Sequence, residues 1–157
     1  MTRHWVIAPV RARPPERFDN VWQFDLANNI ITIGYPELGD ISNMSLQDLT
    51  EAVPEVYPEG PNSAGFAKML WRFYHEISVG DLVIARRGLM ILAAVGEVTQ
   101  PAVYSPGKNP HIDAPNVLGV SWWNTPRDKD FGGPVFSQWT VTSITPERFQ
   151  ELVGVPR

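Results

Sequence analysis

The chain has 157 residues, of which 43% are hydrophobic, 19% are charged and none is cysteine. This length fits one domain, which we expect to span residues 1–157, and the apolar content is too high for a disordered chain. The lack of cysteine excludes a disulfide framework, a thiol nucleophile and a zinc site with thiolate ligands, and leaves the cytoplasm as the expected location. The longest apolar run has nine residues, 88–96, against about 20 needed to span a bilayer, so no membrane partner is expected.

Charge is distributed unevenly along the chain, whose net value is −4. Residues 1–20 carry a net charge of +2, residues 21–65 carry −7 without one Lys or Arg, and residues 66–90 return to +2. If the N-terminal arginines and the basic residues between 68 and 87 converge in space, they form an anion-binding face; the alternative is an ordinary mixed surface. The acidic total therefore does not exclude a nucleic-acid partner.

The first half of the chain alternates between β-branched runs and amphipathic segments. Pro14-Pro15 is a plausible helix start, and Ser45 with Asp48 resembles a capping box. The resulting elements are a strand over 4–9, a short helix reaching Asp25, a strand over 30–34, a helix over 46–53 and a Pro/Gly loop over 54–65, the best candidate for a mobile lid.

The second half begins with a helix over 66–77, whose spacing puts Phe66, Leu70, Phe73 and Ile77 on one core face. Trp71 falls on the opposite flank. Strands over 82–85 and 89–98 form a hairpin, and a strand near 118–122 follows. A last strand over 135–142 contains Trp139, which we expect in the core. Thr145 and Pro146 predict the start of a final helix. The order β-α-β-α-α-β-β-β-β-α indicates one α+β domain with an antiparallel or mixed sheet.

The sequence contains no recognisable motif for catalysis or cofactor binding. The histidines His4, His75 and His111 have no metal-ligand spacing, and no nucleophile elbow, P-loop or dinucleotide fingerprint occurs. Glu37 and Asp40 are a possible carboxylate pair, although such pairs are common on surfaces. We therefore expect no cofactor, no metal and no enzymatic activity.

Three aromatic residues stand outside the core pattern: Trp22, Tyr35 and Trp71. Aromatic walls suit a flat, weakly polar ligand such as a nucleobase, and a flipped base also needs hydrogen bonds to its edge. The turn of Asp40, Ile41 and Ser42 offers such groups. The alternative is that all three rings cap the edges of the core. Phosphates would be held by four basic residues: Lys68, Arg72, Arg86 and Arg87.

The chain resembles the EVE/YTH-like branch of the PUA-like superfamily. The resemblance rests on the order of WVIAP, NIITIGYPELGDIS, LWRFYHEISVGDLVIARRG, ILAAVGEVT and VSWW, and covers residues 4–152. IGYPELGDIS is similar to the N-terminal recognition domains of modification-dependent restriction endonucleases of the McrBC and related types, with Tyr35 where such domains often have Trp.

The resemblance implies a small twisted mixed β-barrel flanked by helices, with a cage that accepts a flipped base such as methylated or hydroxymethylated cytosine or N6-methyladenine. It implies that Arg86 and Arg87 line the mouth of the pocket, and that Tyr104 and His111, in the loop after GEVT, lie where YTH-type relatives have further cage aromatics. The cage itself would comprise Trp22, Tyr35, Asp40, Ile41, Ser42 and Trp71.

The main hypothesis is a non-catalytic reader of modified DNA that targets a restriction or defence nuclease carried by a partner domain or subunit. Two alternatives remain open, because PUA-like folds also bind RNA and because ASCH-like relatives hydrolyse modified nucleosides. The hydrolase would need a dyad in the pocket, for which Lys68 with Glu37 is the candidate.

Overall fold

Seven strands build one mixed sheet in the computed structural model, which describes residues 1–60 and 62–154. Hydrogen-bonded neighbours follow the order β2-β5-β4-β3-β1-β7, and β6 pairs with β4. The strands are β1 (His4–Ile7), β2 (Ile30–Ile33), β3 (Leu82–Arg87), β4 (Ile91–Tyr104), β5 (Asn116–Trp122), β6 (Lys129–Asp130) and β7 (Val141–Ile144).

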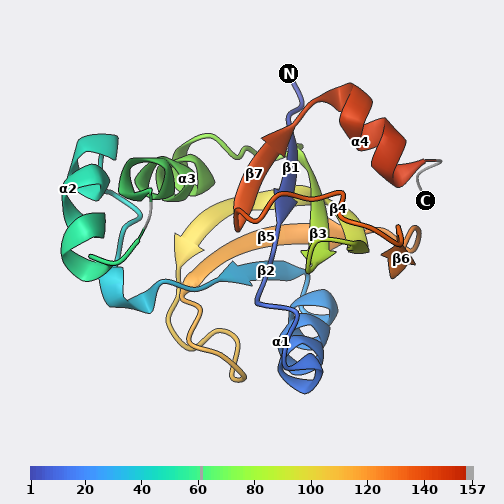
Figure 1. Ribbon diagram of the computed structural model, residues 1–157, viewed down its shortest axis with the longest axis horizontal. Coiled ribbons are helices and arrows are strands. Elements are labelled where there is room, and N and C mark those ends of the chain that lie inside the picture. Colours follow the sequence, from blue (N-terminus) through green and yellow to red (C-terminus); the bar gives the residue numbers. More distant parts are fainter. Residues whose placement is uncertain (61, 155–157) are drawn as a thin grey trace.

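The α+β class and the mixed sheet are confirmed, but the expected barrel is wrong. Within the described part of the chain β2 and β7 are the two ends of the strand order and do not pair with each other. The sheet therefore stays open, although the long strands β4 and β5 curve strongly (Figure 1).

The N-terminal strand lies inside the sheet. β1 pairs in parallel with β3 and antiparallel with β7. The carboxylate of the buried Asp81 fixes this junction, because it accepts hydrogen bonds from the backbone N–H of Arg3 (3.0 Å), the indole N–H of Trp5 (3.0 Å) and the backbone N–H of Ser78 (2.9 Å).

Four α-helices and one 3₁₀ turn surround the sheet: α1 (Pro15–Ala27), η1 (Pro36–Leu38), α2 (Leu46–Val56), α3 (Ser63–His75) and α4 (Pro146–Val153). In Figure 1, α2 and α3 pack together on one side of the sheet, and α1 and α4 lie away from them and from each other. No helix in the described residues is long and apolar enough to cross a membrane.

Helix starts were the best predicted local features. Both hydrogen bonds of the capping box at Ser45 and Asp48 are present, and the Thr145 hydroxyl accepts from the backbone N–H of Arg148. The loop predicted over 54–65 is shorter than expected, since α2 continues through Pro54 to Val56 and α3 already begins at Ser63.

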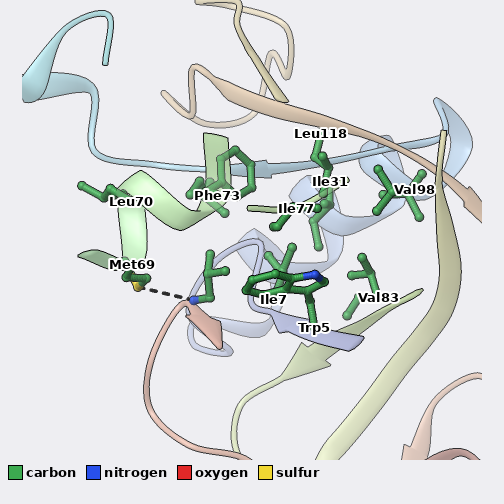
Figure 2. Close-up of a cluster of buried hydrophobic side chains, with 14 of the residues drawn as sticks. Trp5, Ile7, Ile31, Met69, Leu70, Phe73, Ile77, Val83, Val98 and Leu118 are labelled. Carbon is green, nitrogen blue, oxygen red and sulfur yellow. Dashed lines mark hydrogen bonds between the residues drawn. The ribbon is translucent and has the colours of Figure 1, made fainter. Parts of the chain in front are cut away.

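The main core lies between α3 and the sheet. Leu70 and Phe73 of α3 meet Trp5 and Ile7 of β1 together with side chains of β2 and β5 (Figure 2). The Val141 backbone N–H also donates to the Met69 sulfur at 3.4 Å, which attaches the start of β7 to α3. The core face predicted for this helix is thus confirmed for Leu70 and Phe73, whereas Phe66 is only half-buried. Ile77 is also buried, but it lies after the helix, which ends at His75 and not at residue 77.

The last predicted strand is wrong over most of its length. Residues 135–140 are irregular, and β7 begins only at Val141. Trp139 was expected in the core but is 38% exposed. In place of continuous strand pairing, a few backbone hydrogen bonds and the Arg86 guanidinium hold this segment beside the sheet. Arg86 donates to the backbone carbonyls of Gln138 and Trp139.

Candidate functional site

Two adjoining pockets meet at Tyr35, the second residue after β2. Tyr35 has a left-handed backbone, with φ 68° and ψ 45°, directly before the 3₁₀ turn η1. Such a conformation is uncommon for a bulky residue and is maintained only where the surroundings favour it. The Tyr35 hydroxyl lies 2.6 Å from the hydroxyl of Thr140, just before β7. The ring is thereby fixed between the two edges of the open sheet.

The first pocket, which we call the arginine pocket, has a volume of about 550 Å³. Its walls come from the β1–α1 connection, the residues after β2, the end of β3 and the segment before β7. It is lined by Ala8, Pro9, Val10, Arg11, Ala12, Arg17, Gly34, Tyr35, Arg86, Gly88, Leu89, Ile112, Gln138 and Thr140.

Positive charge dominates the arginine pocket, because its lining includes three arginines and no carboxylate. Arg11 and Arg17 are exposed, whereas Arg86 is 7% exposed. Burial lowers the pKa of Arg86, yet an arginine remains protonated at neutral pH. The sequence left open whether the N-terminal arginines and the 68–87 group converge. Of the latter group, only Arg86 joins Arg11 and Arg17 in this pocket.

Arg86 is the buried arginine of this pocket. Its guanidinium donates to the carbonyl oxygens of Gly88 (2.8 Å), Gln138 (3.2 Å) and Trp139 (3.1 Å), while its buried Nε has no hydrogen-bond partner. No ion pair of the described residues includes Arg86. Its charge is thus held in place by neutral acceptors and is not cancelled by a protein carboxylate.

A buried carboxylate holds the loop that contributes Ile112. Asp25 of α1 accepts hydrogen bonds from the backbone and hydroxyl of Thr32 and from the amide of Asn109. Asn109 also donates to the Val21 carbonyl and accepts from the backbone N–H of His111. Burial raises the pKa of Asp25 to about 6, although these hydrogen bonds oppose the shift.

The second pocket, which we call the aromatic cleft, has a volume of about 760 Å³ and runs between α2, α3 and the segment before β7. Ring centroids of Tyr35 and Phe66 are 4.7 Å apart, and those of Phe66 and Tyr57 are 5.6 Å apart. The lining residues are Arg11, Tyr35, Val53, Val56, Tyr57, Pro58, Glu59, Gly60, Asn62, Ser63, Phe66, Gln138 and Trp139.

Two acidic groups belong to the aromatic cleft or contact its lining. Glu59 is an exposed lining residue, and the Tyr57 hydroxyl donates to Glu37 Oε1 at 2.6 Å. Burial, followed by this contact with Glu37, raises the pKa of Tyr57, so its phenol stays neutral. Burial also raises the pKa of Tyr35.

A third, smaller pocket of about 170 Å³ contains two of the predicted phosphate-binding residues, Lys68 and Arg72, beside Trp139. Arg72 already pairs with Glu76 and lies 5.0 Å from the Trp5 ring centroid. Lys68 is exposed, whereas Arg72 is half-buried.

The predicted cage residues do not come together. Trp22 is 3% exposed and packs edge-on against Trp122, with ring centroids 4.9 Å apart. Ile41 is 1% exposed. Both side chains belong to the main core, so neither lines any of the three pockets. Of the predicted cage, only Tyr35 is a pocket residue.

The remaining cage candidates, Asp40, Ser42 and Trp71, contact residues close to them in the sequence. Asp40 is exposed and accepts from the backbone and hydroxyl of Ser42, which lowers its pKa. Trp71 is half-buried against the core, with its ring centroid 5.2 Å from that of His75. These residues stabilise a turn and a helix surface, and none of them lines a pocket.

Apart from Arg86 in the arginine pocket and Lys68 and Arg72 in the third pocket, the other predicted residues line none of the three pockets. Arg87 pairs with Asp19 at 3.0 Å and covers the Phe18 ring. His111 is exposed with its ring 6.2 Å from that of Phe24, and Tyr104 ends β4. Lys68 and Glu37, the hydrolase candidates, do not line a common pocket.

Sequence reasoning missed five residues as site residues: Arg11, Arg17, Tyr57, Phe66 and Trp139. The arginines were noticed only as charge, and the three rings were assigned to a loop, a helix core face and a strand. The convergence of these residues depends on tertiary structure. The one local indication was the Pro/Gly-rich setting of Tyr57.

A comparison with family models finds a match to "Domain of unknown function (DUF8426)" over residues 12–145. No curated protein matches the sequence. The matched range contains Tyr35, Tyr57, Arg86 and Trp139, and so includes the central residues of both large pockets.

Proposed function

The chain belongs to the DUF8426 family, whose description gives no function, and we propose that it is a non-catalytic nucleic-acid reader that takes an unstacked, modified base into the arginine pocket. The proposed ligand is DNA carrying methylated or hydroxymethylated cytosine or N6-methyladenine. In this proposal the domain directs a restriction or defence nuclease in the cytoplasm.

The observation that carries this proposal is the placement of Tyr35 in the wall of a pocket lined by three arginines and no carboxylate. An aromatic ring and apolar neighbours such as Pro9 and Ile112 offer stacking surfaces for a base. Guanidinium groups attract the phosphates on either side of it. The pocket thus joins the two kinds of contact that an unstacked nucleotide requires.

The positions that the family resemblance implies also support this pocket. Tyr35 follows β2, Arg86 is the penultimate residue of β3, and Ile112 comes from the loop after β4 that was expected to contribute contacts. The base-binding role of Trp22 has no such support, because its ring packs in the core.

The test is a binding titration with matched oligonucleotides that differ in one base modification, prepared both as DNA and as RNA. We expect tighter binding to one modified DNA, and Tyr35→Ala should reduce that preference about 5- to 150-fold, which corresponds to a stacking energy of about 1–3 kcal/mol. Equal affinity of the unaltered protein for modified and unmodified DNA would overturn the proposal. A preference for RNA would favour the RNA-binding alternative.

Arginine variants supply a matched control. Arg11→Gln and Arg17→Gln should each weaken binding to all sequences and reduce its salt dependence. Arg13→Gln removes the same charge from an exposed residue of the same connection that does not line the pocket. It should have a smaller effect than either pocket variant.

A further inference from the structure

The aromatic cleft is a second binding surface that the proposed function leaves unused. Tyr57, Phe66 and Trp139 line it together with Val53 and Val56. Its volume of about 760 Å³ is within the usual range for pockets that bind small organic groups. Trp139 is 38% exposed, so much of its ring is available to a ligand.

The cleft is continuous with the arginine pocket. Arg11, Tyr35 and Gln138 line both. Tyr35 is therefore a shared wall, and its bond to Thr140 keeps that wall in place. A group entering the cleft lies next to whatever occupies the arginine pocket.

Charge separates the two pockets. The arginine pocket has three arginines and no acid, whereas the cleft has Arg11 at the shared border and Glu59 in its lining. Glu37 lies just behind Tyr57, to which it is hydrogen-bonded. These carboxylates repel a phosphate and Arg11 attracts it, while an uncharged ring is free to enter the cleft.

Polar groups in the cleft match the edge of a nucleobase. The Tyr57 hydroxyl donates a hydrogen bond to Glu37, and its oxygen can still accept a hydrogen bond from a ligand. Gln138 contributes an amide with both a donor and an acceptor. Aromatic walls with a few such groups are typical of base-binding surfaces in proteins that hold single strands.

We propose that the aromatic cleft binds the nucleobase adjacent to the modified one, so that the domain recognises a dinucleotide with Tyr35 between its two bases. This inference rests on the proposed function, since it places the modified base in the arginine pocket. The phosphate that joins the two nucleotides then lies near Arg11, which belongs to both pockets.

The test uses oligonucleotides that carry the preferred modified base and lack the base on its 5′ or its 3′ side. For the unaltered protein, removing one of these two neighbours should weaken binding about 5- to 150-fold, as the loss of one stacked base predicts. In Trp139→Ala the same removal should change the affinity by a smaller factor than in the unaltered protein, because one aromatic wall of the cleft is already absent.

Met90→Ala is the control variant, because Met90 is 41% exposed and lines none of the three pockets. It should retain the full effect of the missing neighbour. Circular dichroism and urea unfolding of Trp139→Ala check that the fold is retained. Tyr57→Phe provides a second variant, which should weaken binding only to neighbours whose edge donates a hydrogen bond.

The outcomes separate the two proposals. If modified DNA is preferred but neither neighbouring base matters, or if Trp139→Ala leaves the effect unchanged, the dinucleotide inference is wrong and the reader function stands. If the neighbour matters without any preference for the modification, the reader function fails and the cleft remains a base-binding site. If bulkier substituents on the modified base raise the affinity, and Trp139→Ala abolishes this increase, the inference is overturned. The cleft would then bind the substituent of the modified base and not the neighbouring base.

Discussion

The hydroxyl groups of Tyr35 and Thr140 lie 2.6 Å apart and connect two edges of the sheet that share no backbone pairing. Tyr35 follows β2, the strand at one end of the sheet, and Thr140 precedes β7, the strand at the other end. A single side-chain contact therefore bridges the opening that a closed barrel would fill with backbone hydrogen bonds, and it does so in the wall of both large pockets.

Loss of this bond should loosen the wall without removing its aromatic surface. Tyr35→Phe is expected to lower the free energy of unfolding by about 1 kcal/mol while keeping most of the affinity for modified DNA. Urea unfolding and the oligonucleotide titration measure the two effects. Thr140→Val tests the same bond from its other side. If the variant with both substitutions is no less stable than the less stable of the two single variants, the two residues act as a pair.

The buried Asp25 should give the stability of the protein a pH dependence. Its folded pKa of about 6 lies above the ordinary value of 3.8, so the folded state binds the proton more tightly than the unfolded chain. Its contribution to stability is therefore fully present below about pH 4 and is lost as the pH rises through about 6. Between these limits the change amounts to about 3 kcal/mol.

Urea unfolding of the unaltered protein and of Asp25→Asn, from pH 4 to pH 8, isolates this contribution from the other carboxylates. The stability of the unaltered protein relative to the variant should decrease from pH 4 to pH 6.5 and then stay level. A constant difference across this range would show that Asp25 keeps an ordinary pKa.

Arg86 and Arg87 are neighbours in sequence but should behave differently on substitution. Arg86→Met leaves three carbonyl oxygens without their donor and should reduce stability by about 3 kcal/mol. Arg87→Ala removes a partly exposed ion pair and a contact with Phe18, with an expected loss of about 1 kcal/mol. Thermal unfolding distinguishes the two variants, and equal losses would contradict the structural role of Arg86.

Gly96 should tolerate no side chain. A Cβ atom there would lie 2.6 Å from both the Ser121 carbonyl oxygen and a methyl group of Val120 in the paired strand. Gly96→Ala is therefore expected to cost about 1–3 kcal/mol. At Gly133 a Cβ would meet nothing within 4 Å, so Gly133→Ala is the matched control and should unfold at nearly the temperature of the unaltered protein.

Features that depend on nearby residues were predictable from the sequence. The start of α2 rests on Ser45 and Asp48, three residues apart, and the core face of α3 follows from helical spacing. The irregular segment before β7 was not predictable, because its carbonyl groups are bound by Arg86, more than 50 residues earlier. The local sequence pattern is typical of a strand, and it does not record the hydrogen bonds that the Arg86 side chain donates to two of these carbonyl groups.

The candidate site shows the same limit. Tyr35 was recognised because it interrupts the pattern of a buried strand, whereas Trp22, also selected as unusual, packs on Trp122. Trp139 and Phe66 were assigned to the core since each fits a local periodicity. Their position in one cleft follows from the packing of α3 beside the segment before β7, which no pattern in either segment records.

The position of β1 inside the sheet has a consequence for the order of folding. His4 pairs with Leu82 on one side and with Ile144 on the other, so β1 leaves the ribosome before both of its partners and acquires the first only after some eighty further residues have been made. Its second partner is made some sixty residues later still. Pairings of such long range make folding slow and keep a β-strand edge open in the nascent chain, and a chaperone that covers residues 4–7 would protect the step on which completion of the sheet depends.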